Sequence, residues 1–76
     1  MKIDVVTTEE IVYSGDVDTV IAPGSDGQLG ILPRHAALLT SIEAGIVLVR
    51  NASGETEIPV GDGFMEVSGD QVTILV

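Results

Sequence analysis

Short apolar runs rich in β-branched residues recur along the chain, and turn-forming residues separate them at close spacing. Val, Ile and Thr pack well on pleated strands, and runs of this length favour strands over buried helices. The pattern predicts strands over Lys2–Thr7, Glu9–Tyr13, Val17–Ala22, Gly45–Arg50, Thr56–Val60, Phe64–Val67 and Gln71–Val76. Strands at this spacing predict an all-β fold, either a sandwich or a barrel.

Clusters of Gly, Ser, Asn and Asp mark the predicted turns. These are Ser14-Gly15-Asp16, Asn51-Ala52-Ser53-Gly54, Gly61-Asp62-Gly63 and Ser68-Gly69-Asp70, of which the second has hairpin chemistry. The segment His35–Thr40 is rich in good helix formers, but it is short and has no clean cap. We expect an extended or turn conformation there, with a helical turn as the alternative.

The predicted strands carry more apolar residues than one buried face needs. In Gly45–Arg50 both faces are apolar, and a thin sandwich buries only one face of each layer. The residues expected to remain on an outer surface, where they would attract a partner, are Val6, Val20, Val47, Val49 and Leu75. The alternative is a different register, because a slip of one residue exchanges the two faces.

The stretch from Ala22 to Ala36 contains glycines at fixed offsets, at positions 24, 27 and 30, between Pro23 and Pro33. Glycine permits positive φ or close backbone approach, and proline fixes φ. We interpret the stretch as a shaped loop that projects Leu29 at its tip for docking. The alternative is a compact turn that only reverses the chain.

Composition limits the chain to one small domain, residues 1–76, with an aliphatic core. Apolar residues make up 45% of the 76 residues, with one Tyr, one Phe, no Trp and no Cys. The net charge of −9 argues against nucleic-acid binding and against docking on anionic lipid, and it favours a basic protein surface as partner. Neither an export signal nor a membrane-spanning run is visible, so we expect a soluble chain without lipid insertion.

No set of residues in the sequence indicates catalysis. His35 is the only histidine and has no visible partner, so we expect it to hold the loop or to meet another protein. The glycine spacing matches no phosphate-binding motif, and Asp16-x-Asp18 lacks the other ligands of a calcium loop. We therefore predict a non-enzymatic protein that uses no cofactor and no metal.

Several segments together resemble the epsilon subunit of bacterial-type F-type ATP synthase. They are Asp4-Val5-Val6-Thr7, Tyr13-Ser14-Gly15, Pro23-Gly24-Ser25-x-Gly27-x-Leu29-Gly30-Ile31-Leu32-Pro33-x-His35-Ala36-x-Leu38-Leu39-Thr40, Gly63-Phe64-x-Glu66-Val67 and Val72-Thr73-Ile74-Leu75. The resemblance covers nearly the whole chain. It implies a small flattened β-sandwich of about eight to ten short, mainly antiparallel strands.

The resemblance also implies a function, which is to link the gamma subunit to the membrane c-ring in the rotor. Asp26, Gly27, Gln28, Leu29 and Gly30 would contact the c-ring, while Thr7 and His35 would lie toward gamma. The subunit would be peripheral at the cytoplasmic face of the inner membrane, and the isolated domain would be monomeric.

The sequence departs from the family in three respects. The family often has an acidic residue at the position of Gln28 and Gly at that of Arg34. Family members usually continue into a C-terminal helical hairpin that inhibits ATP hydrolysis or binds ATP, and these activities are not carried over to a sequence that stops at Val76. The alternative function is a free-standing ligand-binding β-sandwich, which would need concave polar and aromatic groups.

Overall fold

The computed structural model describes all residues from 1 to 76 and contains nine strands and no helix. The strands are β1 (Lys2–Val6), β2 (Ile11–Asp16), β3 (Thr19–Gly24), β4 (Gly27–Ile31), β5 (Leu38–Ile42), β6 (Gly45–Asn51), β7 (Gly54–Val60), β8 (Gly63–Ser68) and β9 (Gln71–Leu75). The predicted all-β class is confirmed. The segment His35–Thr40, expected to be extended or a turn, contains no helix, and its residues from Leu38 onward belong to β5.

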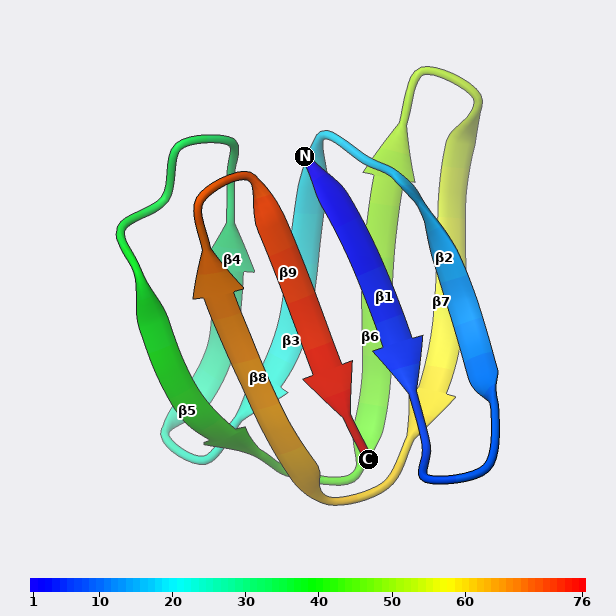
Figure 1. The fold of residues 1–76 in the computed structure, drawn as a ribbon, viewed down its shortest axis with the longest axis vertical. Coiled ribbons are helices and arrows are strands. Elements are labelled where there is room, and N and C mark those ends of the chain that lie inside the picture. Colours follow the sequence, from blue (N-terminus) through cyan, green and yellow to red (C-terminus); the bar gives the residue numbers. More distant parts are fainter.

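One continuous sheet folds over on itself to make two layers (Figure 1). The front layer has the order β2-β1-β9-β8-β5, and the back layer has the order β4-β3-β6-β7. A single residue pair, Gly24 with Ile42, continues the sheet from one layer to the other. Neighbouring strands are antiparallel except for β1 and β9, which are parallel.

The core between the layers is entirely apolar and mostly β-branched. Alternate residues of the strands point into it, as period-two alternation requires. Its members are Ile3, Val5, Val17, Val20, Ala22, Ile31, Ile42, Val47, Val49, Ile58, Met65, Val67, Val72 and Ile74. No polar side chain is buried there, so the core has no buried unpaired group that would cost stability.

The structure corrects the predicted outer face in the back layer. Val20 and Val47 are completely buried and Val49 is 1% exposed, so none of the three is available to a partner. Their neighbours along the chain, Ile21 and Leu48, point outward instead and pair with each other. Both faces of β6 are apolar, so the sequence pattern alone did not determine which face of this strand is buried in the core.

In the front layer, the other two predicted outer residues point outward. Val6 is half-buried and Leu75 is exposed, and they are neighbours across the parallel β1–β9 pair. The prediction of an apolar outer surface therefore holds for the front layer at these two residues.

Two strand boundaries near the candidate site and the front layer differ from the prediction. Ser14-Gly15-Asp16 belongs to β2 rather than to a turn, because these residues pair with β1. The second half of the glycine-rich stretch, Gly27–Ile31, is strand β4 and forms a hairpin with β3. The predicted final strand is present as β9, which lies between β1 and β8 in the sheet order.

The turns gather at two opposite ends of the sandwich, which Figure 1 shows as upper and lower. The upper end holds Met1, Val17-Asp18, Leu32–Ala37, Asn51–Gly54 and Ser68–Asp70. The lower end holds Thr7–Glu10, the turn Gly24–Gly27, Glu43-Ala44, Gly61-Asp62 and Val76.

The corrected face can be tested with two neighbouring substitutions. Val49→Lys places an unpaired charge in the core and should lower the free energy of unfolding by about 4 kcal/mol or more, whereas Leu48→Lys should lower it by about 1 kcal/mol. Urea denaturation followed by circular dichroism measures both values. Equal destabilisation by the two variants would contradict the assignment of faces.

Candidate functional site

The glycine-rich hairpin between β3 and β4 ends in a tight turn at the lower end. Gly27 has a φ of 117°, which L-residues rarely adopt. A Cβ on Gly24 would lie 2.6 Å from the carbonyl oxygen of Gly27, so this position requires glycine as well. The Ser25 and Ser41 hydroxyl oxygens lie 2.8 Å apart and tie the turn to β5. The hairpin is therefore held in one shape.

The predicted c-ring residues divide into exposed and supporting positions. Asp26, Gly27, Gln28 and Gly30 are exposed, and they are available to a partner. Leu29 is half-buried and packs against the core, so the prediction that it projects from the tip is wrong. The reason is that Gly27–Ile31 is a strand, whose side chains alternate between the surface and the core.

The fold of this chain does not require glycine at position 30. A Cβ there would meet nothing within 4 Å, and its φ is not positive. Glycine in a strand interior generally weakens the strand and often marks a place where another backbone approaches closely. Gly30 is thus suited to contact with another molecule.

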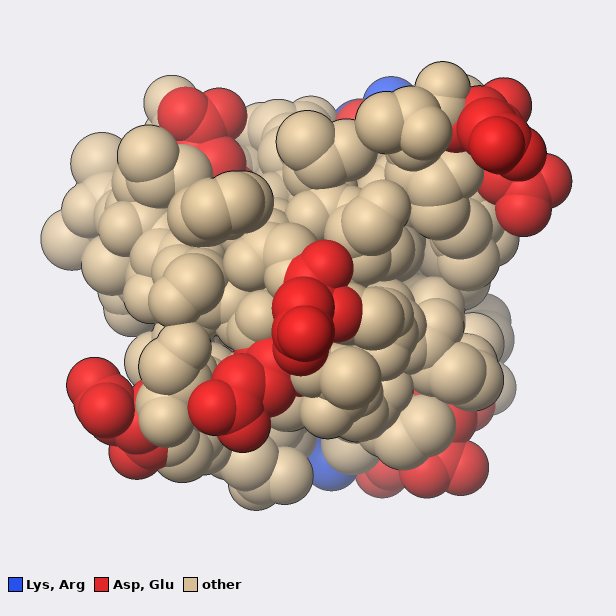
Figure 2. Space-filling model, turned by 90° about the horizontal axis from the view of Figure 1, so that it is seen from below, with Lys and Arg blue, Asp and Glu red and all other residues tan.

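The lower end of the sandwich is strongly acidic. Its turns carry Glu9, Glu10, Asp26, Glu43 and Asp62, while the three basic residues, Lys2, Arg34 and Arg50, lie toward the upper end. Figure 2, which views this end, shows scattered acidic side chains and only small parts of basic ones at the rim. Such a field attracts a basic surface and repels an acidic one.

The front layer has an apolar row across its outer face near the lower end. We define the front patch as Val6, Ile11, Phe64 and Leu75. Val6 pairs with Ile11 on one side and with Leu75 on the other, and Leu75 pairs with Phe64. Phe64 is 59% exposed and Ile11 is 67% exposed. A contiguous row of exposed apolar side chains indicates an interaction surface.

The back layer has a second apolar surface. We define the back patch as Ile21, Ile46, Leu48 and Pro59. Ile21 pairs with Leu48 and Ile46 pairs with Pro59. Ile46 is 45% exposed. The molecule thus presents apolar side chains on both of its broad faces.

A polar bridge crosses three front strands above the front patch. The Ser14 hydroxyl donates to Asp4 Oδ1 at 2.6 Å, and Gln71 Nε2 donates to Asp4 Oδ2 at 3.1 Å. The Ser14 hydrogen bond, followed by that of Gln71 and the charge of Lys2, outweighs desolvation and holds the pKa of Asp4 below its ordinary value. The carboxylate is therefore a structural acceptor.

The two predicted gamma-contact residues lie at opposite ends of the front layer. Thr7 follows β1 at the lower end, where its hydroxyl accepts the N–H groups of Glu9 and Glu10, each at 3.1 Å. His35 precedes β5 at the upper end and is exposed. The structure does not bring them together, but the outer face of the front layer lies between them.

His35 is oriented by its own loop. Its Nδ1 lies 2.8 Å from the carbonyl oxygen of Ala36, and a carbonyl only accepts, so Nδ1 carries a proton in this contact. The preceding Arg34 has a φ of 67°, a left-handed backbone conformation that glycine adopts more readily than other residues. These residues border the largest hollow, of about 560 Å³, together with Met1, Pro33, Gly69 and Asp70.

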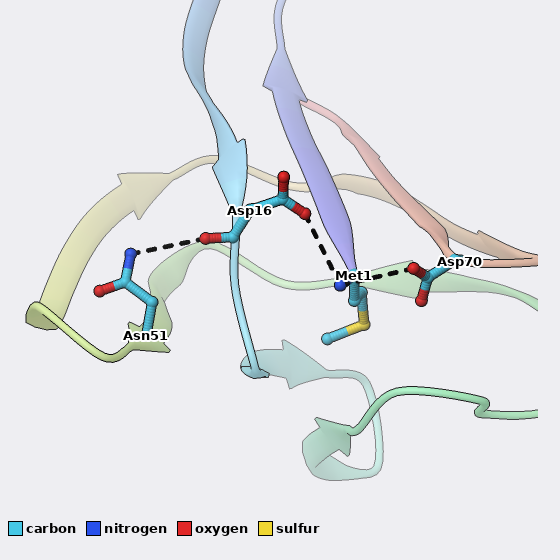
Figure 3. Close-up of polar contacts among 4 residues, drawn as sticks. All are labelled: Met1, Asp16, Asn51 and Asp70. Atoms are coloured by element: carbon cyan, nitrogen blue, oxygen red, sulfur yellow. Dashed lines mark hydrogen bonds and ion pairs between the residues drawn. The ribbon is translucent and has the colours of Figure 1, made fainter.

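A polar cluster that sequence reasoning missed closes the upper end (Figure 3). The Met1 amino group lies 3.7 Å from Asp16 Oδ1 and 3.5 Å from Asp70 Oδ2. Asn51 Nδ2 donates to the Asp16 carbonyl oxygen at 3.5 Å. The cluster joins β1, β2 and the β8–β9 turn to the back layer. No local sequence signal marks it, because its members are far apart in the chain.

The His, Asp and Glu side chains of this chain are scattered rather than gathered into one cluster. No group of three or more His, Cys, Asp or Glu side chains is placed to hold a metal ion. His35 has no acid or nucleophile bonded to it. No helix long and apolar enough to cross a bilayer is present. The features that stand out are the acidic hairpin end and the two apolar faces.

The whole chain matches one protein family. The family profile described as "ATP synthase, Delta/Epsilon chain, beta-sandwich domain" matches residues 1–76. The ATP synthase epsilon chain of Carboxydothermus hydrogenoformans is 47% identical over 76 residues, covering 99% of this chain and 56% of that protein. The epsilon chain of Brevibacillus brevis is 45% identical, covering 99% and 58%. This chain therefore spans little more than half the length of these curated relatives.

Solved structures share the fold at lower identity. A chain in the cryo-EM structure of the Euglena gracilis mitochondrial ATP synthase, OSCP/F1/c-ring, matches with a TM-score of 0.89 and 19% identity, over 97% of this chain and 48% of that chain. A chain in the central stalk/c-ring structure of the Tetrahymena thermophila mitochondrial ATP synthase matches with a TM-score of 0.78 and 20% identity, over 99% and 61%. These likenesses support the two-layer β fold.

The Asp4 bridge makes a pH-dependent prediction. A pKa that is lowered on folding means that the folded chain binds the proton less tightly than the unfolded chain, so the ionised Asp4 stabilises the fold above about pH 4 and loses this effect as pH falls. Ser14→Ala should therefore be less stable than the parent at neutral pH, and the difference should shrink in acid. Urea unfolding across that range measures it, and a difference independent of pH would contradict this role of Ser14.

Proposed function

The chain belongs to the family of the β-sandwich domain of ATP synthase delta and epsilon chains, and from this membership we propose that it acts in the central stalk as the N-terminal domain of an epsilon subunit. In this role it makes no covalent bond itself. It links gamma to the c-ring, so that ion-driven rotation of the ring turns the shaft that drives catalysis elsewhere. The observation that carries the proposal is the match over all residues 1–76, joined by epsilon relatives above 40% identity.

We assign the lower end to the c-ring. Asp26, Gly27, Gln28 and Gly30 are exposed on this hairpin, and Leu29 anchors the hairpin to the core. The surrounding acidic turns favour ring loops that carry basic or polar side chains. Gln28 adds a neutral amide, which both donates and accepts hydrogen bonds.

We assign the front face to gamma. The front patch begins beside Thr7, and the same layer continues to the loop of His35 at the other end. A gamma surface laid along the front layer would therefore meet an apolar patch and the exposed imidazole of His35. Apolar cores with polar rims are the usual anatomy of stable protein interfaces.

A rotor link has to resist deformation under torque. Of the 46 backbone hydrogen bonds in this 76-residue chain, 39 lie within the strands. Every strand pairs with at least one neighbour, and the core is fully apolar. Close-packed interiors have low compressibility and transmit strain. The domain is thus built to transmit force between two surfaces rather than to change shape.

The complex would place the domain at the membrane as a peripheral component on the cytoplasmic face, held by protein contacts.

A free-standing ligand-binding module is the weaker alternative. Neither aromatic residue lines any of the three surface hollows, because Tyr13 packs against the core and Phe64 lies on the front face. Stacking groups in a concave site, which such a module needs, are absent.

Charge reversal at the hairpin tests the ring contact. Asp26→Lys should weaken binding to detergent-solubilised c-ring by about tenfold at low salt, with a smaller effect at high salt because the charges are solvent-exposed. Asp18→Lys makes the same charge change at the upper end and is the matched control. Surface plasmon resonance measures both affinities. Equal loss in the two variants would mean that net charge, rather than the hairpin, determines binding.

Polar substitution on each broad face tests the gamma contact. Phe64→Ser in the front patch should weaken binding to purified gamma subunit by about 2 kcal/mol, because exposed aromatic residues are frequent binding hot spots. Ile46→Ser in the back patch, at similar exposure, should leave this affinity unchanged. Isothermal titration calorimetry compares them, and a larger loss for Ile46→Ser would move gamma to the back face.

A further inference from the structure

The chain contains two Asp-Gly steps, Asp26-Gly27 and Asp62-Gly63, both at the lower end. An aspartate followed by glycine is prone to cyclise, because glycine has no Cβ to hinder approach of its amide nitrogen. We propose that Asp26 is a site of spontaneous isoaspartate formation in the folded protein and that the fold protects Asp62. The modification itself does not depend on the proposed rotor function.

The reaction needs only the chain and water. The Gly27 amide nitrogen attacks the side-chain carboxyl carbon of Asp26, a C–N bond forms, and the amide proton leaves with the carboxyl hydroxyl as water. The product is a five-membered succinimide. Water then adds to either ring carbonyl. Cleavage of the new bond restores Asp26, whereas cleavage of the bond between the Asp26 main-chain carbonyl carbon and the Gly27 nitrogen leaves isoaspartate.

Asp26 has the freedom that this reaction requires. It is exposed, and its carboxylate has no hydrogen-bond or ion-pair partner, whereas the neighbouring Ser25 is held by Ser41. Gly27 is exposed, has a φ of 117° and has no atom within 4 Å of a Cβ position. Nothing packed around this step prevents the carboxyl carbon and the amide nitrogen from meeting when the turn opens locally.

Asp62 is restrained on both sides of its step. Its Oδ1 accepts the backbone N–H of Ala44 at 2.8 Å, which holds the carboxylate toward a different segment. Gly63 lies directly beneath the end of β9, since a Cβ there would lie 2.9 Å from both the Leu75 carbonyl carbon and the Val76 Cα. If the main chain at Asp62-Gly63 rotated into the geometry needed to form a succinimide, it would collide with these atoms of β9 and Val76. The same dipeptide therefore has opposite susceptibility in two settings.

Isoaspartate at position 26 would change the hairpin. The main chain gains one methylene at the turn, and the carboxylate moves to a shorter branch, so the pairing of Gly24 with Gly27 cannot be kept unchanged. If the ring covers this turn, as the proposed function has it, the reaction would be confined to unassembled chains. This last consequence alone rests on the proposed function.

The test incubates the purified folded chain in mildly acidic and neutral buffer at physiological temperature. Isoaspartyl methyltransferase then labels the new α-carboxyl group, and proteolysis with mass spectrometry assigns the site. Label at Asp26 should accumulate at least about tenfold faster than at Asp62, as expected when local structure protects one site. Equal rates at both sites in the folded chain, or no label at Asp26, would overturn the proposal.

Two controls separate structure from sequence. In urea above the unfolding midpoint, both sites should react at rates within about threefold, because the protection of Asp62 comes from the fold. Asp26→Glu should abolish the label in the hairpin peptide, since glutamate would have to form a larger ring. Persistent protection of Asp62 in urea, or label that survives Asp26→Glu, would contradict the assignment.

Discussion

The structure depends on the burial of one face of each layer in a sandwich made from a single folded sheet. A chain of 76 residues can form only one core, and its β-branched strands supply more apolar residues than that core accepts. The remainder forms the front and back patches, which are exposed on the two broad faces. The abundant Val, Ile and Leu residues therefore both stabilise the fold, in the core, and supply apolar surface for partner binding, in the two patches.

The two ends of the sandwich differ in chemistry although both consist of turns. The upper end contains the basic residues and the cluster in which Asp16 and Asp70 approach the Met1 amino group. The lower end is acidic and carries the stiff glycine hairpin. A body with apolar broad faces and one acidic tip can bind one partner along its side and another at its end, which is the geometry that a link in a rotor requires.

Strand content could be predicted from the sequence because β-branched runs and turn residues are local signals. The burial of Val49 could not be predicted in the same way. Both faces of this strand are apolar, with Val47 and Val49 on one and Ile46 and Leu48 on the other, so the buried face depends on how β6 pairs with β3. The glycine spacing indicated a chain reversal in this stretch, but it predicted a loop rather than a strand. The pairing of Gly27–Ile31 with β3 is a contact between strands that glycine spacing does not specify. The acidic end and the Met1 cluster join residues distant in sequence, so no local pattern showed them.

The hairpin end and the front face are proposed to contact different partners in the same assembled enzyme. Site-specific photo-crosslinking tests this proposal most directly, with a photoreactive phenylalanine analogue placed at Gln28 in one variant and at Phe64 in another, in the intact membrane complex. We expect Gln28 to crosslink to the c-ring and Phe64 to crosslink to gamma. Crosslinking of both positions to one subunit, or of Gln28 to gamma and Phe64 to the c-ring, would contradict the proposal.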